Sequence, residues 1–226
     1  MVEITGIEVG DDPDAWRAVG FAVDEAGTCR IGSIPLHLVG TDRGRGILGW
    51  TLRGLTGPPP ADGTIDGLPT STDGTDTATG DGCDAVPAPV EHPIGATRID
   101  HVVVLAPDLG RLVSALAAVG LEPRRTRDTD TYGFPAQQVF YRLGEAILEV
   151  VGAADTAAGP PGADPTQPAR FFGLAMTVTD LDAAADRLAP HVGRVKPAVQ
   201  EGRRIATIRH RELHLSVAIA LMSPDP

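Results

Sequence analysis

Lysine, cysteine and aromatic residues are scarce in this chain, and it has no long apolar run. Lys196 is the only lysine, and the formal net charge is −11. This charge argues against nucleic acid or an anionic membrane as a main partner, because both need a basic surface. No apolar run reaches the roughly 18 to 20 residues that span a bilayer. The acidic N-terminus has no signal-peptide pattern, so we expect a cytoplasmic protein.

Several motifs of well-known chemistry are also missing. The chain has no Walker A sequence, no Gly-x-Ser-x-Gly nucleophile elbow and no Cys-x-x-Cys pair. Its two cysteines, Cys29 and Cys83, are too few for a cysteine-type zinc site. Nucleotide and flavin chemistry therefore have little support in the sequence.

Two segments rich in Gly, Pro, Asp and Thr divide the chain. Residues 56–90 contain no basic residue, and residues 152–169 have a similar composition. Such segments carry too little apolar surface to offset the entropy lost on ordering. We therefore predict an N-terminal module, a linker, and a larger domain made of two modules that a second linker joins. Their bounds are 1–55, 56–91 and 92–223, with modules 92–151 and 170–223 and the joining linker 152–169.

The two modules of the larger domain repeat one pattern. Residues 98–109 (RIDHVVVLAPDL) match residues 170–181 (RFFGLAMTVTDL), and residues 144–151 (GEAILEVV) match 211–218 (RELHLSVA). Each module predicts a strand, a helix with apolar residues at helical spacing, and three further strands. Residues 1–55 suggest a shortened third copy, although an unrelated small α+β cap would also fit them. A repeat of this size is more informative than any single motif.

A doubled βαβββ unit with the sequences DHVVV, PDL and ILEVV resembles the vicinal-oxygen-chelate superfamily. That group includes glyoxalase I, bleomycin-resistance proteins, extradiol dioxygenases and methylmalonyl-CoA epimerase. The resemblance covers residues 98–222. It implies an α+β fold in which tandem modules form one curled mixed sheet around a central cleft, with the shortened N-terminal module beside it. It says little about function, because the superfamily hosts many chemistries and some pure binders.

The resemblance also implies four inward positions that can hold a divalent metal, on the first and last strand of each module. In the middle module these positions carry His101 and Glu149, which are ligand-type residues. Their equivalents in the last module are Gly173 and Ser216, which are not. His214 shares a predicted strand face with Ser216 and is the candidate third ligand of a Zn, Ni, Mn or Fe ion. A site without any metal is the other expectation.

The N-terminal module offers residues at the same places. Gly6 takes the first-strand position there, and His37 takes the position that Glu149 has in the middle module.

Strand alternation places His101 and Glu149 in the cleft independently of the resemblance. Glu149 lies inside an apolar strand, so a metal, His101, an arginine or water must satisfy its carboxylate. Without a metal, His101 is a candidate general base that Glu149 would orient. The candidate substrate-binding residues beside this pair are Gln138, Arg142, Tyr132, Phe134 and Ser216.

Three functions stay open on this evidence. The first is a glyoxalase-like lyase, isomerase or dioxygenase that acts on a small oxygenated molecule. The second is a metal-free protein that sequesters a ligand, as antibiotic-resistance members of the superfamily do. The third is a structural module with a closed cleft. The predicted partner is a small molecule, and a homodimer is compatible with the pairing of modules in this superfamily.

Overall fold

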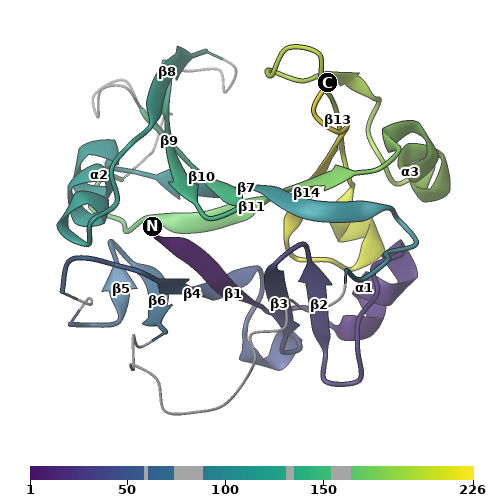
Figure 1. The fold of residues 1–226 in the computed structure, drawn as a ribbon, viewed down its shortest axis with the longest axis horizontal. Helices are drawn as coiled ribbons and strands as arrows, with labels where there is room; N and C mark the ends of the chain where they lie inside the picture. Colours follow the sequence, from purple (N-terminus) through teal and green to yellow (C-terminus); the bar gives the residue numbers. More distant parts are fainter. Residues whose placement is uncertain (59–60, 74–88, 131–134, 154–163) are drawn as a thin grey trace.

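The computed structural model describes residues 1–58, 61–73, 89–130, 135–153 and 164–226. Within these residues the chain forms two mixed β-sheets, which three α-helices accompany (Figure 1). The predicted α+β class with tandem βαβββ modules is confirmed.

The larger sheet contains both modules of the C-terminal region. The middle module consists of β7 (Ala96–Ala106), α2 (Leu109–Ala118), β8 (Arg125–Thr129), β9 (Ala136–Leu143) and β10 (Ala146–Ala153). The last module consists of β11 (Arg170–Val178), α3 (Leu181–Leu188), β12 (Lys196–Pro197), β13 (Arg204–Thr207) and β14 (Ala218–Met222). The strand order is β12-β13-β14-β11-β7-β10-β9-β8, so the first strands of the two modules lie side by side at the centre. The sheet curls into an open half-barrel (Figure 1).

The repeated sequence produces the same helix start in both modules. The Asp108 carboxylate accepts a hydrogen bond from the backbone N–H of Arg111, and Asp180 accepts from the N–H groups of Asp182 and Ala183. These carboxylates satisfy N–H groups that the first helical turn leaves without a backbone partner. Each helix buries one apolar stripe, which consists of Leu109, Leu112 and Leu116 in α2 and of Leu181, Ala184 and Leu188 in α3.

The smaller sheet belongs to the N-terminal region. It contains β1 (Glu3–Val9), β2 (Thr28–Ile31), β3 (Ile34–Leu38), β4 (Ile47–Arg53), β5 (Thr64–Ile65) and β6 (Leu68–Thr72), and α1 (Pro13–Val19) follows β1. Its strand order is β2-β3-β1-β4-β6-β5. Along this order, neighbouring strands pair antiparallel, parallel, antiparallel, parallel and antiparallel. The six strands β9-β10-β7-β11-β14-β13 of the large sheet pair in the same series.

The N-terminal region is thus a reduced version of the whole half-barrel. The shortened module that we predicted over residues 1–55 reaches only as far as β3, as β1-α1-β2-β3. β4, which that range included, instead forms a further shortened copy with β5 and β6, without a helix. Residues 64–72, which we assigned to the first linker, instead form β5 and β6. The reason is two apolar side chains, Ile65 and Leu68, which are buried and compensate for the ordering of this polar stretch. The other domain boundaries stay predictions.

The small sheet packs below the convex side of the large one (Figure 1). The Trp50 ring of β4 lies edge-on to Phe171 of β11, with 5.2 Å between centroids. Asp11, which is fully buried, accepts hydrogen bonds from the indole N–H of Trp16 and from the backbone N–H of Ser216. The Ser216 hydroxyl donates to the same carboxylate at 2.5 Å. Apolar packing and a buried polar link therefore join the two halves.

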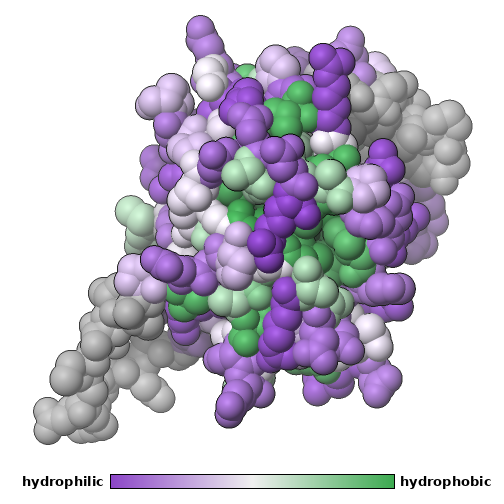
Figure 2. All heavy atoms as spheres, turned by 90° about the vertical axis from the view of Figure 1, so that its right-hand side faces the viewer, coloured by the Kyte–Doolittle hydropathy of each residue, from purple (hydrophilic) through white to green (hydrophobic). Residues whose placement is uncertain are grey.

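On the side that carries α1 and α3, hydrophilic side chains cover most of the surface, and apolar residues show between them (Figure 2). Among the described residues, no helix has both the length and the apolar character that crossing a membrane requires.

Candidate ligand-binding cleft

Two adjoining cavities lie on the concave face of the large sheet. The larger has a volume of about 530 Å³ and the smaller about 450 Å³. Both are lined by His101, Arg127, Phe140, Val199 and Gln200, so they are parts of one cleft. Residues of β7, β9, β10, β11 and β14 line the larger cavity, which places it between the two modules, as predicted.

Glu149 lies in the cleft, as strand alternation predicted, and its partner there is Gln138. The Gln138 side-chain amide donates a 2.5 Å hydrogen bond to the Glu149 carboxylate. Gln138 is buried on the neighbouring strand β9, where it pairs in register with Val151. This amide provides a hydrogen-bond donor for one oxygen of the half-buried carboxylate, which lowers the cost of burying it.

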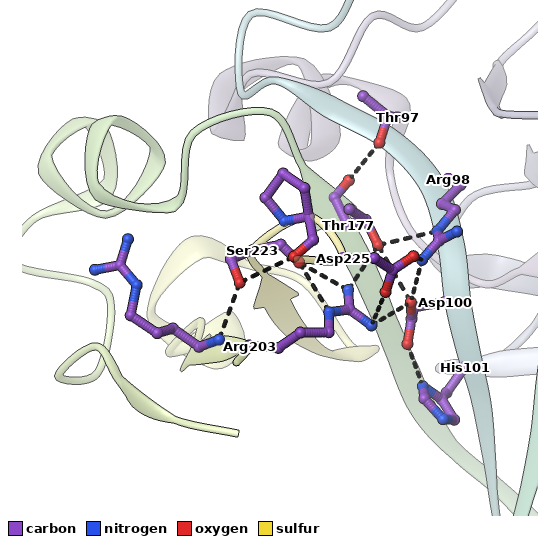
Figure 3. Close-up of polar contacts among 10 residues, drawn as sticks. Thr97, Arg98, Asp100, His101, Thr177, Arg203, Ser223 and Asp225 are labelled. Carbon is purple, nitrogen blue, oxygen red and sulfur yellow. Dashed lines mark hydrogen bonds and ion pairs between the residues drawn. The ribbon is translucent and has the colours of Figure 1, made fainter. Parts of the chain in front are cut away.

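His101 also lines the cleft, but its carboxylate partner is Asp100 and not Glu149. The Nδ1 atom of His101 lies 2.6 Å from Oδ2 of Asp100, and both side chains are buried (Figure 3). The contact is short, but its geometry is not that of a hydrogen bond, and the buried Oδ2 atom has no hydrogen-bond partner in the part of the chain that the structure describes. Within the described residues, His101 forms no hydrogen bond or ion pair with Glu149. The expected His101–Glu149 pair is therefore wrong, since each residue has its own partner.

Behind His101, Asp100 belongs to a buried cluster of charged and polar groups. Its Oδ1 accepts hydrogen bonds from the Arg203 guanidinium at 2.8 Å, from Arg98 at 3.1 Å and from the Thr177 hydroxyl at 3.2 Å. Arg203 also donates to the backbone carbonyl of Ser223. In Figure 3 the Asp100 carboxylate lies between the Arg203 guanidinium and the His101 ring.

The cluster keeps Asp100 ionised. Burial by itself raises the pKa of this carboxyl, but the contacts with His101 and Arg203 outweigh burial and hold the pKa well below its ordinary value. A negative charge next to Nδ1 favours a proton on that nitrogen. Nε2 is then the ring atom left for a ligand in the cleft.

Comparison with known proteins gives the family. A model described as a glyoxalase-like domain matches residues 99–222. The chain belongs to this family. The glyoxalase-like assignment confirms the resemblance to the vicinal-oxygen-chelate superfamily, and no curated protein matches the chain.

Solved structures are similar to this chain in fold. A triple mutant of 4-hydroxymandelate synthase from Streptomyces coelicolor is 13% identical with a TM-score of 0.59, and the match covers 99% of this chain and 92% of that one. A fusion protein of a xylose isomerase-like TIM barrel and 4-hydroxyphenylpyruvate dioxygenase is 14% identical with a TM-score of 0.57, over 99% of this chain and 49% of that one. Methylmalonyl-CoA epimerase from Mycobacterium tuberculosis is 21% identical with a TM-score of 0.46, over 58% of this chain and 91% of that one. At these identities the likeness shows the fold alone.

The glyoxalase-like fold implies a metal site, and strand register locates its four positions here. His101 pairs with Ile147, and Glu149 lies two residues further along β10. In the last module Gly173 pairs with Ala218, so the equivalent of Glu149 is Ala220. The sequence alignment that matched Ser216 with Glu149 is wrong, because we expected the last strand to begin at Glu212. Residues 210–213 instead form a 3-10 helix, η3, and β14 begins only at Ala218.

The residues at these positions do not fit a metal ion. Gly173 and Ala220 line the larger cavity and bring no donor atom. A Cβ atom on Gly173 would overlap the carbonyl oxygen of Ala218, so the backbone also leaves no room for a ligating side chain. Across the described residues, no three His, Cys, Asp or Glu side chains are grouped as a metal site would need. A catalytic zinc site usually has three protein ligands.

Two predicted site residues lie away from the cleft. His214 ends η3 in the left-handed region at φ 61°, and its side chain is exposed rather than directed at a metal. Ser216 binds Asp11, as described above, and its hydroxyl accepts a 2.5 Å hydrogen bond from the Gly46 N–H. It therefore holds the two halves together instead of contacting a substrate.

The other predicted residues divide into two groups. Gln138 lines the larger cavity and Arg142 the smaller. Tyr132 and Phe134 lie outside the described residues. Arg127 was not among the predicted site residues, although it shares a strand face with Arg125 and period-two alternation could have indicated it. Nothing in the sequence pointed to Asp100, because its partner Arg203 lies 103 residues away.

Proposed function

We propose that this glyoxalase-like protein binds a small organic molecule in the cleft between its modules without a divalent metal. The observation that carries the proposal is the pair of adjoining cavities that meet at His101. Apolar side chains such as Phe140, Leu174 and Met222 line the larger cavity, with a few polar groups among them. Most small-molecule sites combine an apolar wall with a few placed polar groups in this way.

A variant that fills the cleft tests this proposal. Ala220→Leu adds bulk in the larger cavity, whereas Ala183→Leu makes the same change at an exposed position of α3. Compounds that raise the melting temperature of the parent, found in a thermal-shift screen of dicarbonyls, catechols and natural-product antibiotics, should stop doing so in Ala220→Leu. They should keep the shift in Ala183→Leu. Equal shifts in all three proteins would show that binding occurs elsewhere and would overturn the proposal.

A second candidate function is proton transfer to or from a carbon next to a carbonyl, with His101 as the general base. The contact between Asp100 and Nδ1 favours it, because a carboxylate beside Nδ1 leaves Nε2 as the ring nitrogen that can accept a proton from a ligand. Glu149 is not available to orient His101, since Gln138 holds it.

Hydrogen exchange in D₂O tests this candidate. Carbonyl compounds that bind the parent are followed by NMR for loss of the C–H signal next to the carbonyl. His101→Gln should slow the exchange by about 100-fold or more, the usual contribution of a general base. His210→Gln, another histidine that lines the larger cavity, should leave the rate near that of the parent. No exchange in the parent, or an unchanged rate in His101→Gln, would exclude the role.

A further inference from the structure

The charge of the cleft is opposite to that of the chain. The sequence has 30 Asp and Glu residues against 19 Lys and Arg. Yet among the described residues, the two cavities are lined by five Arg and Lys residues and by one carboxylate, that of Glu149. The basic ones are Arg124, Arg125, Arg127, Arg142 and Lys196. A positive cleft in an acidic protein concentrates anions and repels cations.

Strand register places three of these arginines together. Arg125 and Arg127 alternate on β8, where they pair with Phe140 and Gln138 of β9. Arg142 lies two residues beyond Phe140 on β9, so the three arginines share the cleft-facing side of two adjacent strands. All three line the smaller cavity, whereas Glu149 lines only the larger one. Arg127 lines both cavities, so Arg125 and Arg142 are the two of these arginines at the end of the cleft that lacks the carboxylate.

These arginines do not neutralise carboxylates of the protein. Within the described residues, the side chains of Arg125, Arg127 and Arg142 form no ion pair or hydrogen bond. The nearby Asp128 instead accepts a hydrogen bond from Gln137. Their guanidinium groups are thus available to a ligand, and a guanidinium can bind a carboxylate or phosphate through two parallel hydrogen bonds.

The cleft also carries exposed apolar side chains. Phe172, which is 51% exposed, lines the larger cavity, and Val199, which is 68% exposed, lines both. Large apolar residues grouped at a cavity mark a surface that a partner covers.

We propose that the ligand of this cleft is an anion with an apolar body, whose carboxylate or phosphate group binds the arginines of β8 and β9 while its apolar part lies between the modules. This inference rests on the proposed ligand-binding function and adds the chemical class.

Matched probes test the inference by calorimetry on the full-length protein. The acid is 3-phenylpropionate, the neutral probe is 3-phenylpropanamide, and 2-phenylethyl phosphate is the phosphate arm. Propionate and inorganic phosphate are anions without the apolar body. One of the two aromatic anions should bind at least about tenfold more tightly than the amide, the ratio that ~1.4 kcal/mol gives. The preference should shrink as salt is raised, because screening weakens the ion pair.

An arginine variant locates the anion site. Arg127→Met should remove most of the preference for the anion and leave the affinity for the amide unchanged. Arg45→Met, which changes an exposed arginine of the N-terminal half, should alter neither. Circular dichroism and thermal unfolding of Arg127→Met should match the parent, since Arg127 has no partner to lose among the described residues.

Each remaining result decides the matter. If the amide binds as tightly as both aromatic anions, or if Arg127→Met keeps the full preference, the anion class is wrong while binding in the cleft stands. If propionate binds as tightly as 3-phenylpropionate, or inorganic phosphate as tightly as 2-phenylethyl phosphate, the ligand needs no apolar body and that part of the inference is wrong. If none of the probes binds the parent at millimolar concentration, both the anion class and the proposed ligand-binding function are overturned.

Discussion

The two halves of this chain share one strand order but differ in their concave faces. In the C-terminal half, the four positions that face the cleft are His101, Glu149, Gly173 and Ala220. In the N-terminal half, the same register leads to four residues that line a cavity of about 350 Å³, namely Gly6, His37, Gly49 and Ser71. Topology is thus retained where the chemistry differs, so a strand order alone does not specify a function.

The contrast extends to what lies behind each sheet face. The C-terminal half has the buried cluster of Asp100 and Arg203 directly behind His101. In the N-terminal half the buried carboxylate, Asp11, binds Trp16 and Ser216 and so contributes to packing between the halves. Asp100 therefore supports the cleft, whereas Asp11 supports the interface between the two halves. Mutations at each carboxylate and its partners test this difference.

The largest effect is expected at the buried charge of the C-terminal half. Arg203→Met should lower the free energy of unfolding by about 3–5 kcal/mol, because it leaves Asp100 charged and buried with its main partner removed. Arg204→Met, at the neighbouring residue, breaks a surface ion pair with Asp182 and should cost far less, because water already solvates both groups. Urea unfolding measures both. Similar losses in the two variants would show that Arg203 does not compensate a buried charge.

The same cluster predicts how stability changes in acid. The pKa of Asp100 is lower in the folded chain than in the unfolded one, so its contribution is complete above the unfolded pKa of about 3.9. That contribution is lost as the pH falls below this value towards the folded pKa. In Asp100→Asn, unfolding free energies should therefore vary less with pH below about 5 than in the parent. Parallel pH profiles for the two proteins would contradict the assignment.

The next effect is expected at the interface between the halves. Asp11→Ala leaves the Trp16 indole N–H and the Ser216 N–H without their acceptor, and should cost about 2–3 kcal/mol. Asp12→Ala removes an exposed helix cap of α1 and should cost about 1 kcal/mol. Thermal and urea unfolding give both values. If Asp12→Ala is the more damaging, Asp11 does not link the halves as described.

Equivalent glycines allow a direct comparison of the two sheets. In Gly173→Ala the new Cβ atom would overlap the carbonyl oxygen of Ala218, so strands β11 and β14 must move apart. We expect this to lower the free energy of unfolding by about 1–3 kcal/mol. In Gly49→Ala the new atom would lie 3.1 Å from the carbonyl oxygen of Pro69, a tight contact that a small shift relieves. The N-terminal variant should therefore unfold at a higher urea concentration than the C-terminal one. The reverse order would contradict the close strand approach at Gly173.

The smallest effect is expected from metal ions. The cleft has only two ligand-type residues at its four positions, so zinc, nickel, manganese and iron should give no measurable shift in melting temperature. Metal analysis after loading and gel filtration should find no stoichiometric ion. One ion per chain that His101→Ala and Glu149→Ala both lose would restore the metal site that the superfamily implies.

The sequence predicted a large part of the fold for physical reasons that act locally. The helix starts at Asp108 and Asp180 follow from capping, and the apolar spacing of α2 follows from the helical period. Register was less accessible. The sequence matched Ser216 with Glu149 because it gives no sign that residues 210–213 form a 3-10 helix and that β14 begins only at Ala218. Such a slip in register moves every side chain that follows.

The sequence by itself determined the doubled module, the strand faces, and the presence of His101 and Glu149 in the cleft, because all of these depend on periodicity along short segments. Only the tertiary structure decided their partners. Gln138 satisfies Glu149, Asp100 holds His101, and Arg203 holds Asp100. These contacts join strands that are distant in sequence, so no local pattern encodes them. The charge of the cleft emerged in the same way, since the fold gathers arginines of β8 and β9 in a chain that is acidic as a whole.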